Sequence, residues 1–134
     1  MSRITIVDNE FCTMWCYPEK GIIHHEFHQF THGDSFNNIL IKGEEAFKKY
    51  ACTKWLSDDR KLGIVHPDNF DWGAKNWAPK IVAAGWKHWA MLMPTKVTGQ
   101  MSEQRLIQFF AERGVTAQVF TDVEKAMSWL EEQG

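Results

Sequence analysis

The sequence predicts an α/β fold: a sandwich in which helices pack on a mixed, mostly parallel sheet, with an antiparallel hairpin on its N-terminal side. Two observations predict it. From residue 33 onward, segments with apolar residues at helical spacing alternate with short β-type segments, and strands separated by helices pair in parallel through right-handed crossovers. Before them, two β-type segments flank the turn sequence Pro18-Glu19-Lys20-Gly21, which indicates a hairpin.

Length and composition are typical of one folded domain, which we expect to span residues 1–134. The chain is 44% hydrophobic and 24% charged, which excludes a disordered protein. Fifteen Lys and Arg against seventeen Asp and Glu give a net charge of -2, which argues against a nucleic-acid partner. No stretch approaches the roughly 18 apolar residues of a membrane helix, so we expect no membrane insertion. The apolar run from Ile4 to Val7 is too short for a signal peptide, and the three cysteines indicate reduced thiols in the cytoplasm.

The predicted hairpin has one core face and one semi-exposed face. Its strands are residues 10–17 and 22–30. Pairing Tyr17 with Ile22 across the turn directs one alternating set of side chains to the core: Cys12, Met14, Cys16, Ile23, His25 and Phe27. The semi-exposed face then carries Trp15, His24, Glu26 and His28.

Two helices and a short strand follow the hairpin. The stretch 33–50 is helical, because apolar residues recur at the spacing of one helix face: Phe36, Leu40, Phe47 and Tyr50. Gly43 lies on the same stripe, which predicts close packing against the sheet. Residues 53–58 are a predicted strand. The next helix begins at His66-Pro67-Asp68, and Pro79 should bend or interrupt it.

The C-terminal part repeats the alternation. Residues 88–93 are almost all apolar, which is typical of a strand covered on both faces. A helix over 102–113 and a strand over 115–120 follow. Residues 121–124 form a capping box for the last helix, whose core positions keep helical spacing: Val123, Ala126, Met127 and Leu130.

The chain shows no signature of a cofactor, a metal site or a catalytic centre. Four histidines lie close in sequence: His24, His25, His28 and His32. On a strand, His24 and His28 are about 13 Å apart at roughly 3.3 Å per residue, which is too far for one ion. Glycine-rich phosphate loops and the G-x-S-x-G nucleophile elbow are absent from the sequence. We therefore expect no cofactor, no metal and no enzymatic activity.

A candidate binding site lies where two neighbouring predicted strands end. Open α/β sheets bind ligands at the carboxyl edge of their parallel strands. Two carboxylates, a guanidinium, an ammonium, a hydroxyl and an indole should meet at this edge: Asp58, Asp59, Arg60, Lys96, Thr95 and Trp72. Such a mixture suits a small polar ligand or a loop of a partner protein. The plainer alternative is a solvated loop in which one aspartate pairs with the arginine.

Seven tryptophans are many for a chain of this length. Three of them fall outside the predicted apolar stripes: Trp15, Trp72 and Trp129. Exposed aromatic side chains often mark an interface or a pocket, so a homodimer is a further expectation.

These residues resemble the SpoIIAA-like family, which is related to the STAS domain of anti-sigma-factor antagonists and is compared with Sec14-type lipid-binding domains. The order of elements is similar from about residue 10 to residue 131. The local matches are Trp55-Leu56-Ser57-Asp58-Asp59-Arg60 with Lys61, Pro67-Asp68, Trp72, and Gly85 with Lys87 before Ala90.

The resemblance implies a STAS-like sandwich and a small cytoplasmic regulatory or binding module. In anti-sigma antagonists the regulated residue is a phosphorylatable Ser at the start of the helix that follows the third strand, in an Asp-x-Ser-Gly type motif. Here residues 61–71 contain neither Ser nor Thr, and Ser57 lies earlier, within a strand. The departure puts regulation by phosphorylation in doubt for this chain.

Three classes of function remain at this point. The first is a non-catalytic module that binds an unidentified protein partner or small ligand at the carboxyl edge. The second is a lipid or apolar small-molecule carrier of Sec14-like type, with a cavity lined by Trp72, Trp77 and the methionines. The third is an enzyme with Asp58 or Asp59 as general base, which requires a carboxyl pKa raised by burial.

Overall fold

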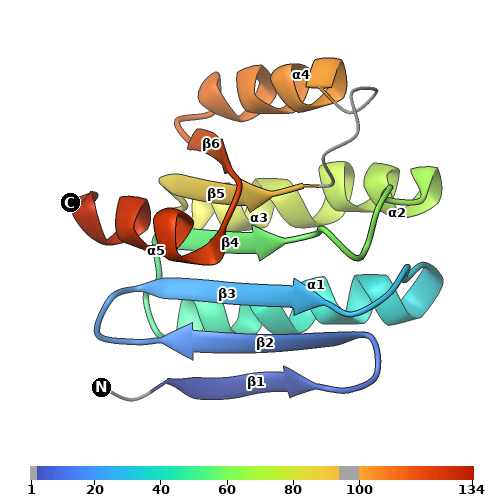
Figure 1. Cartoon of the computed structure of the whole chain (residues 1–134), viewed down its shortest axis with the longest axis horizontal. Helices are drawn as coiled ribbons and strands as arrows, with labels where there is room; N and C mark the ends of the chain where they lie inside the picture. The colour runs from blue at the N-terminus through green and yellow to red at the C-terminus, as the bar shows by residue number, and fades with distance from the viewer. Residues whose placement is uncertain (1–2, 94–99) are drawn as a thin grey trace.

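The computed structural model describes residues 3–93 and 100–134 (Figure 1). Within these ranges the strands are β1 (Ile4–Asp8), β2 (Cys12–Tyr17), β3 (Ile22–Phe27), β4 (Lys54–Asp58), β5 (His88–Leu92) and β6 (Thr116–Phe120). The helices are α1 (Gly33–Lys49), α2 (Pro67–Trp72), the π-helical turn η1 (Gly73–Trp77), α3 (Ala78–Ala83), α4 (Gln100–Ala111) and α5 (Val123–Glu132). No helix in these ranges is both long and apolar enough to cross a membrane.

The strands lie in the sheet in chain order, β1-β2-β3-β4-β5-β6. β1 to β3 pair antiparallel, and β3 to β6 pair parallel. The predicted α/β fold, with a mixed, mostly parallel sheet and an N-terminal antiparallel hairpin, is therefore confirmed. Tyr17 pairs with Ile22, so the face predicted to enter the core does so.

The structure adds one strand that the sequence analysis treated only as a short apolar run. β1 pairs with β2, and the register shifts between Thr5 and Val7, as in a β-bulge. A bulge twists an edge strand and makes it a poorer template for another chain. Five residues with one such irregularity give no clear alternation, which explains why the pattern did not predict β1.

Helices cover both faces of the sheet. α1, α2, η1, α3 and α4 contribute to the larger core, on the face that carries Trp55 of β4. α5 packs on the opposite face, against Leu56 of β4 and Ala90 of β5, and Figure 1 shows it in front of these strands. β4 and β5 are thus covered on both sides, as the apolar run at residues 88–93 predicted.

The helical stretch after β4 is interrupted, as Pro79 predicted. α2 and α3 are separated by η1, in which the N–H of Ala78 donates to the carbonyl of Gly73. Pro79 is near the start of α3 and has no N–H to donate, so the ladder of regular helical hydrogen bonds cannot pass through it. Widening one turn into a π-helix accommodates the missing bond.

The cap of α5 differs by one residue from the prediction. The side chain of Asp122, rather than Thr121, is at the N-cap and accepts the backbone N–H of Lys125 at 2.8 Å. Asp is as good an N-cap as Ser or Thr, so the sequence contained two adjacent candidates.

Candidate functional site

The carboxyl ends of β3, β4 and β5 lie at one edge of the sheet, on the right in Figure 1. Asp58 ends β4, and Asp59 begins the loop to α2. The N–H of Asp59 donates to the carbonyl of Leu92, the last residue of β5, at 2.8 Å. This bond fixes the start of the loop beside the neighbouring strand.

Asp58 and Arg60 form a two-point ion pair. Arg60 donates from Nε to Asp58 Oδ1 at 2.9 Å and from Nη2 to Oδ2 at 2.8 Å. The carboxylate is buried, whereas 44% of the Arg60 side chain is exposed. Burial alone would raise the pKa of Asp58, but the hydrogen bonds from Arg60 outweigh burial and hold this pKa below its usual value. The pair therefore presents a positioned guanidinium to solvent.

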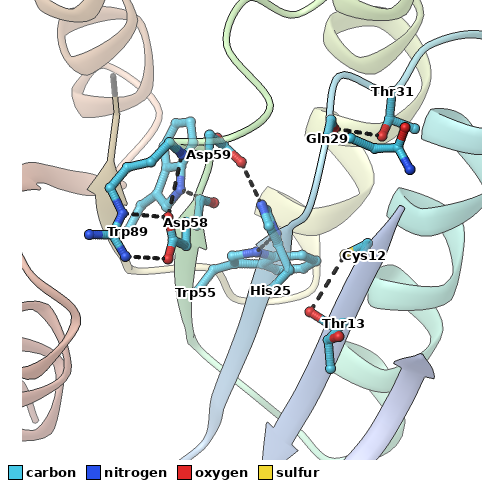
Figure 2. A network of polar contacts seen from close by, with 11 residues as sticks. Cys12, Thr13, His25, Gln29, Thr31, Trp55, Asp58, Asp59 and Trp89 are labelled. Atoms are coloured by element: carbon cyan, nitrogen blue, oxygen red, sulfur yellow. Dashed lines mark hydrogen bonds and ion pairs between the residues drawn. The ribbon is translucent and has the colours of Figure 1, made fainter. Parts of the chain in front are cut away.

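Asp59 takes part in a different network, which Figure 2 shows. The indole N–H of Trp55 donates to Nδ1 of His25 at 2.9 Å. Nδ1 must be the acceptor, because an indole nitrogen only donates. His25 therefore carries its hydrogen on Nε2 and donates it to Asp59 Oδ1 at 2.8 Å. Both ring nitrogens of this buried histidine are occupied.

The hydroxyl of Ser57, the residue before Asp58, is also engaged in a hydrogen bond. Its hydroxyl oxygen accepts the indole N–H of Trp89 at 2.8 Å, and the residue is only 3% exposed. A buried hydroxyl held in this way is closed to a modifying enzyme. Ser57 lies within β4, as the sequence pattern predicts.

The structure separates residues that the sequence analysis placed together. Asp58 shares its face of β4 with Leu56, on the side covered by α5, whereas Asp59 bonds to His25 on the side of α1. Trp72 is half-buried against the larger core and so lies on the side of Asp59, away from Arg60. Consecutive residues at a strand end point to opposite faces, which explains the separation.

Two members of the candidate site, Thr95 and Lys96, lie outside the described residues. Their approach to Asp58 and Arg60 stays a prediction. Among the described members, only Asp58 and Arg60 are in direct contact, and this is the pairing that the plainer alternative anticipated.

His25 is the site residue that sequence reasoning missed. Its side chain was correctly assigned to the core face, and a buried histidine there gave no further signal. The missing information was the register of β3 on β4. In that register His25 lies opposite Ser57, and Asp59 follows Ser57 by two residues in the chain. That register joins segments more than thirty residues apart and cannot be taken from local pattern.

The histidines that are close in sequence do not converge. His24 and His25 occupy opposite faces of β3, and His28 Nε2 lies 2.7 Å from the hydroxyl of Thr13. In the part of the chain that the structure describes, no group of three or more His, Cys, Asp or Glu side chains is arranged to hold a metal ion.

Comparison with known proteins found no match to any family model, any curated protein or any solved structure. The resemblance to the SpoIIAA-like family thus depends on the quoted residues alone.

Proposed function

We propose that this chain is a SpoIIAA-like, STAS-like binding module, without enzymatic activity, that recognises a protein partner or a small ligand at the carboxyl edge of β3, β4 and β5. The observation that carries the proposal is the Arg60 guanidinium, which is exposed to solvent yet fixed by the buried Asp58 carboxylate. An arginine held in one geometry loses little conformational entropy when a ligand binds.

The same geometry favours binding over catalysis. A general base needs a free lone pair and a pKa near the working pH. His25 has both nitrogens engaged, and the pKa of Asp58 is lowered, the direction opposite to the one that a carboxylate base requires. The Ser57 hydroxyl is buried and bonded to Trp89, which makes it a poor nucleophile.

The carrier alternative gains no support from Trp77. Its ring packs edge-on against Trp55, with centroids 5.3 Å apart, and against Trp86 at 5.7 Å. Its indole N–H donates to the carbonyl of Leu40 at 2.8 Å. Trp77 therefore fills the core instead of lining a ligand cavity.

The three tryptophans from which a homodimer was inferred are partly covered by neighbouring side chains. Trp15 is covered by Arg3, whose guanidinium carbon lies 4.6 Å from the ring centroid. Trp129 packs against Phe120, with centroids 5.5 Å apart, and Trp72 packs against the larger core. A homodimer and a cytoplasmic location remain parts of the proposal that light scattering and cell fractionation would test.

A paired variant tests the proposal. Asp58→Asn with Arg60→Gln removes both charges and leaves no buried carboxylate without a partner, so the fold should persist. Immobilised wild-type protein should capture a specific protein, or native mass spectrometry should show a retained small molecule, and the paired variant should lose either. Lys61→Gln, which removes the adjacent exposed cation, is the control and should bind as the wild type does. Equal binding by the paired variant and the control would refute the role of this edge.

A further inference from the structure

Three exposed apolar side chains lie in the two loops at the carboxyl edge or immediately after them. Phe30 is 49% exposed in the loop before α1, Ile64 is 81% exposed in the loop before α2, and Phe70 is 52% exposed on α2. His32 stacks on Phe30, with centroids 5.4 Å apart, and on His66 at 6.0 Å, so the two loops are in contact. We call these five residues the edge patch.

The edge patch is held by a buried side chain behind it. Asn69, which is 3% exposed, donates to the carbonyl of Gly33 at 3.0 Å and to Asn37 Oδ1 at 2.9 Å, and it accepts the N–H of Gly33 at 3.0 Å. These bonds fasten the first turn of α1 to α2. Phe70 therefore projects from a helix that is fixed against α1, and Phe30 lies three residues before the fixed turn, which favours a pre-organised binding surface.

Carboxylates lie in the segments next to the edge patch. Four exposed acidic residues lie in the turn and the helices that adjoin it: Glu10, Asp34, Asp68 and Asp71. Glu10 is brought close by Gln29, whose side chain donates to its carbonyl at 3.1 Å. The cations of the loop before α2 are Arg60, which pairs with Asp58, and Lys61. Among these described residues, negative charge exceeds positive charge around an apolar centre.

This charge pattern selects one kind of occupant. Nucleic acid and anionic lipid headgroups would be repelled by the carboxylates. The four carboxylates form an acidic rim. A second copy related by two-fold symmetry would bring this rim against the same four carboxylates, which is also unfavourable. A cationic protein segment with apolar side chains complements both features.

We propose that the edge patch docks an amphipathic, lysine- or arginine-rich helical segment of a partner protein. Apolar side chains of that segment pack on Phe30, Ile64 and Phe70, and its cations lie over the acidic rim. This inference rests on the proposed binding function and names the chemistry of the partner at the same edge.

A designed peptide tests the inference directly. The probe is a fluorescent helical peptide of leucine and lysine with leucines along one face, and its counterpart has glutamate in place of lysine. Fluorescence anisotropy should show binding of the lysine peptide alone, weakening as salt is added. Phe30→Ser and Phe70→Ser should each lower its affinity about tenfold, as loss of an aromatic anchor does. Ile41→Ser, at an exposed apolar residue within α1, is the matched control and should leave the affinity unchanged.

Several results would overturn the inference. They are no binding of the lysine peptide, equal binding of the glutamate peptide, or equal loss in the Ile41 control. Binding to anionic vesicles that depends on Phe70 would assign the edge patch to a membrane surface. A wild-type dimer that Phe70→Ser converts to monomer, seen by light scattering, would assign it to a second copy.

Failure of the edge-patch inference can be distinguished from failure of the proposed function. If Asp58→Asn with Arg60→Gln loses its captured ligand but the lysine peptide never binds, the edge still functions and only the partner chemistry is wrong. If the peptide binds through Phe30 and Phe70 but nothing depends on Arg60, the ion pair is structural and recognition belongs to the edge patch alone.

Discussion

His24 is buried, contrary to the semi-exposed position that the hairpin pattern predicts. It is 7% exposed, and its Nδ1 has no hydrogen-bond partner. Its ring lies beside those of Trp15 and Tyr17, at centroid distances of 4.8 and 6.5 Å. Burial is the main cause that lowers the pKa of His24 to about 4, with smaller contributions from His25 and Arg3 that also lower it and from Asp58 that raises it. The ring is therefore neutral in the folded protein at neutral pH.

This pKa predicts the direction in which stability changes with pH. The unfolded chain takes up a proton on His24 near pH 6.5, whereas the folded chain does so only near pH 4, so acid favours the unfolded state in between. The free energy of unfolding should fall by about 2 kcal/mol from pH 7 to pH 5 through this residue alone. His24→Phe should remove that decline, as urea unfolding at the two pH values would show.

An exposed histidine provides the control for this prediction. His32→Phe changes the same residue type at an exposed position, and it should keep the decline between pH 7 and pH 5. If His24→Phe declines as steeply as the wild type, burial does not suppress protonation of His24 and the explanation is wrong.

At the scale of elements, α1 approaches the sheet at Gly43. A Cβ atom at this position would overlap Cη2 of Trp55 and would lie 3.1 Å from Cε of Met14. Both neighbours are fully packed in the larger core, so neither has room to move. The close packing predicted from a glycine on an apolar stripe is confirmed.

Gly43→Ala should therefore destabilise the protein although alanine is the better helix former. Helix propensity alone would add about 1 kcal/mol of stability, but overpacking a core costs about 1–3 kcal/mol. We expect a net loss in the free energy of unfolding, measured by urea titration. Gly73→Ala is the control, since its nearest neighbour is Leu40 Cδ1 at 3.9 Å, and it should be neutral or stabilising. A gain in stability for Gly43→Ala would contradict the packing described here.

Most elements could be predicted from local pattern because local chemistry determines them. The turn at Pro18-Glu19-Lys20-Gly21, the proline that interrupts the second helix and the apolar strand at residues 88–93 all act over short distances. β1 was missed because a bulged edge strand of five residues carries little signal. The shift of the α5 cap from Thr121 to Asp122 reflects two neighbouring residues of nearly equal capping strength.

At the scale of the whole molecule, the candidate site was predicted in place but not in detail. The order of strands predicts Asp58, Asp59 and Arg60 at the carboxyl edge, and they lie there in the structure. The strand predicted over residues 53–58 ends at Asp58, as β4 does, but the pattern did not show that the carboxylates of Asp58 and Asp59 lie on opposite faces of the sheet. The bond from His25 to Asp59 depends on the pairing of β3 with β4, which is a property of the assembled sheet.

If the carboxyl edge is the recognition surface, this end of the molecule should contact a partner in the cells that produce the protein. The edge patch and the turn between β2 and β3 lie at opposite ends of β3, and both expose side chains. A photo-reactive benzoylphenylalanine in place of Phe70, or in place of Glu19 as the control, reports what each end contacts. On irradiation of cells at native expression level, the Phe70 position should give a discrete cross-linked product and the Glu19 position none. A product from Glu19 alone, or none from either position, would contradict recognition at this edge.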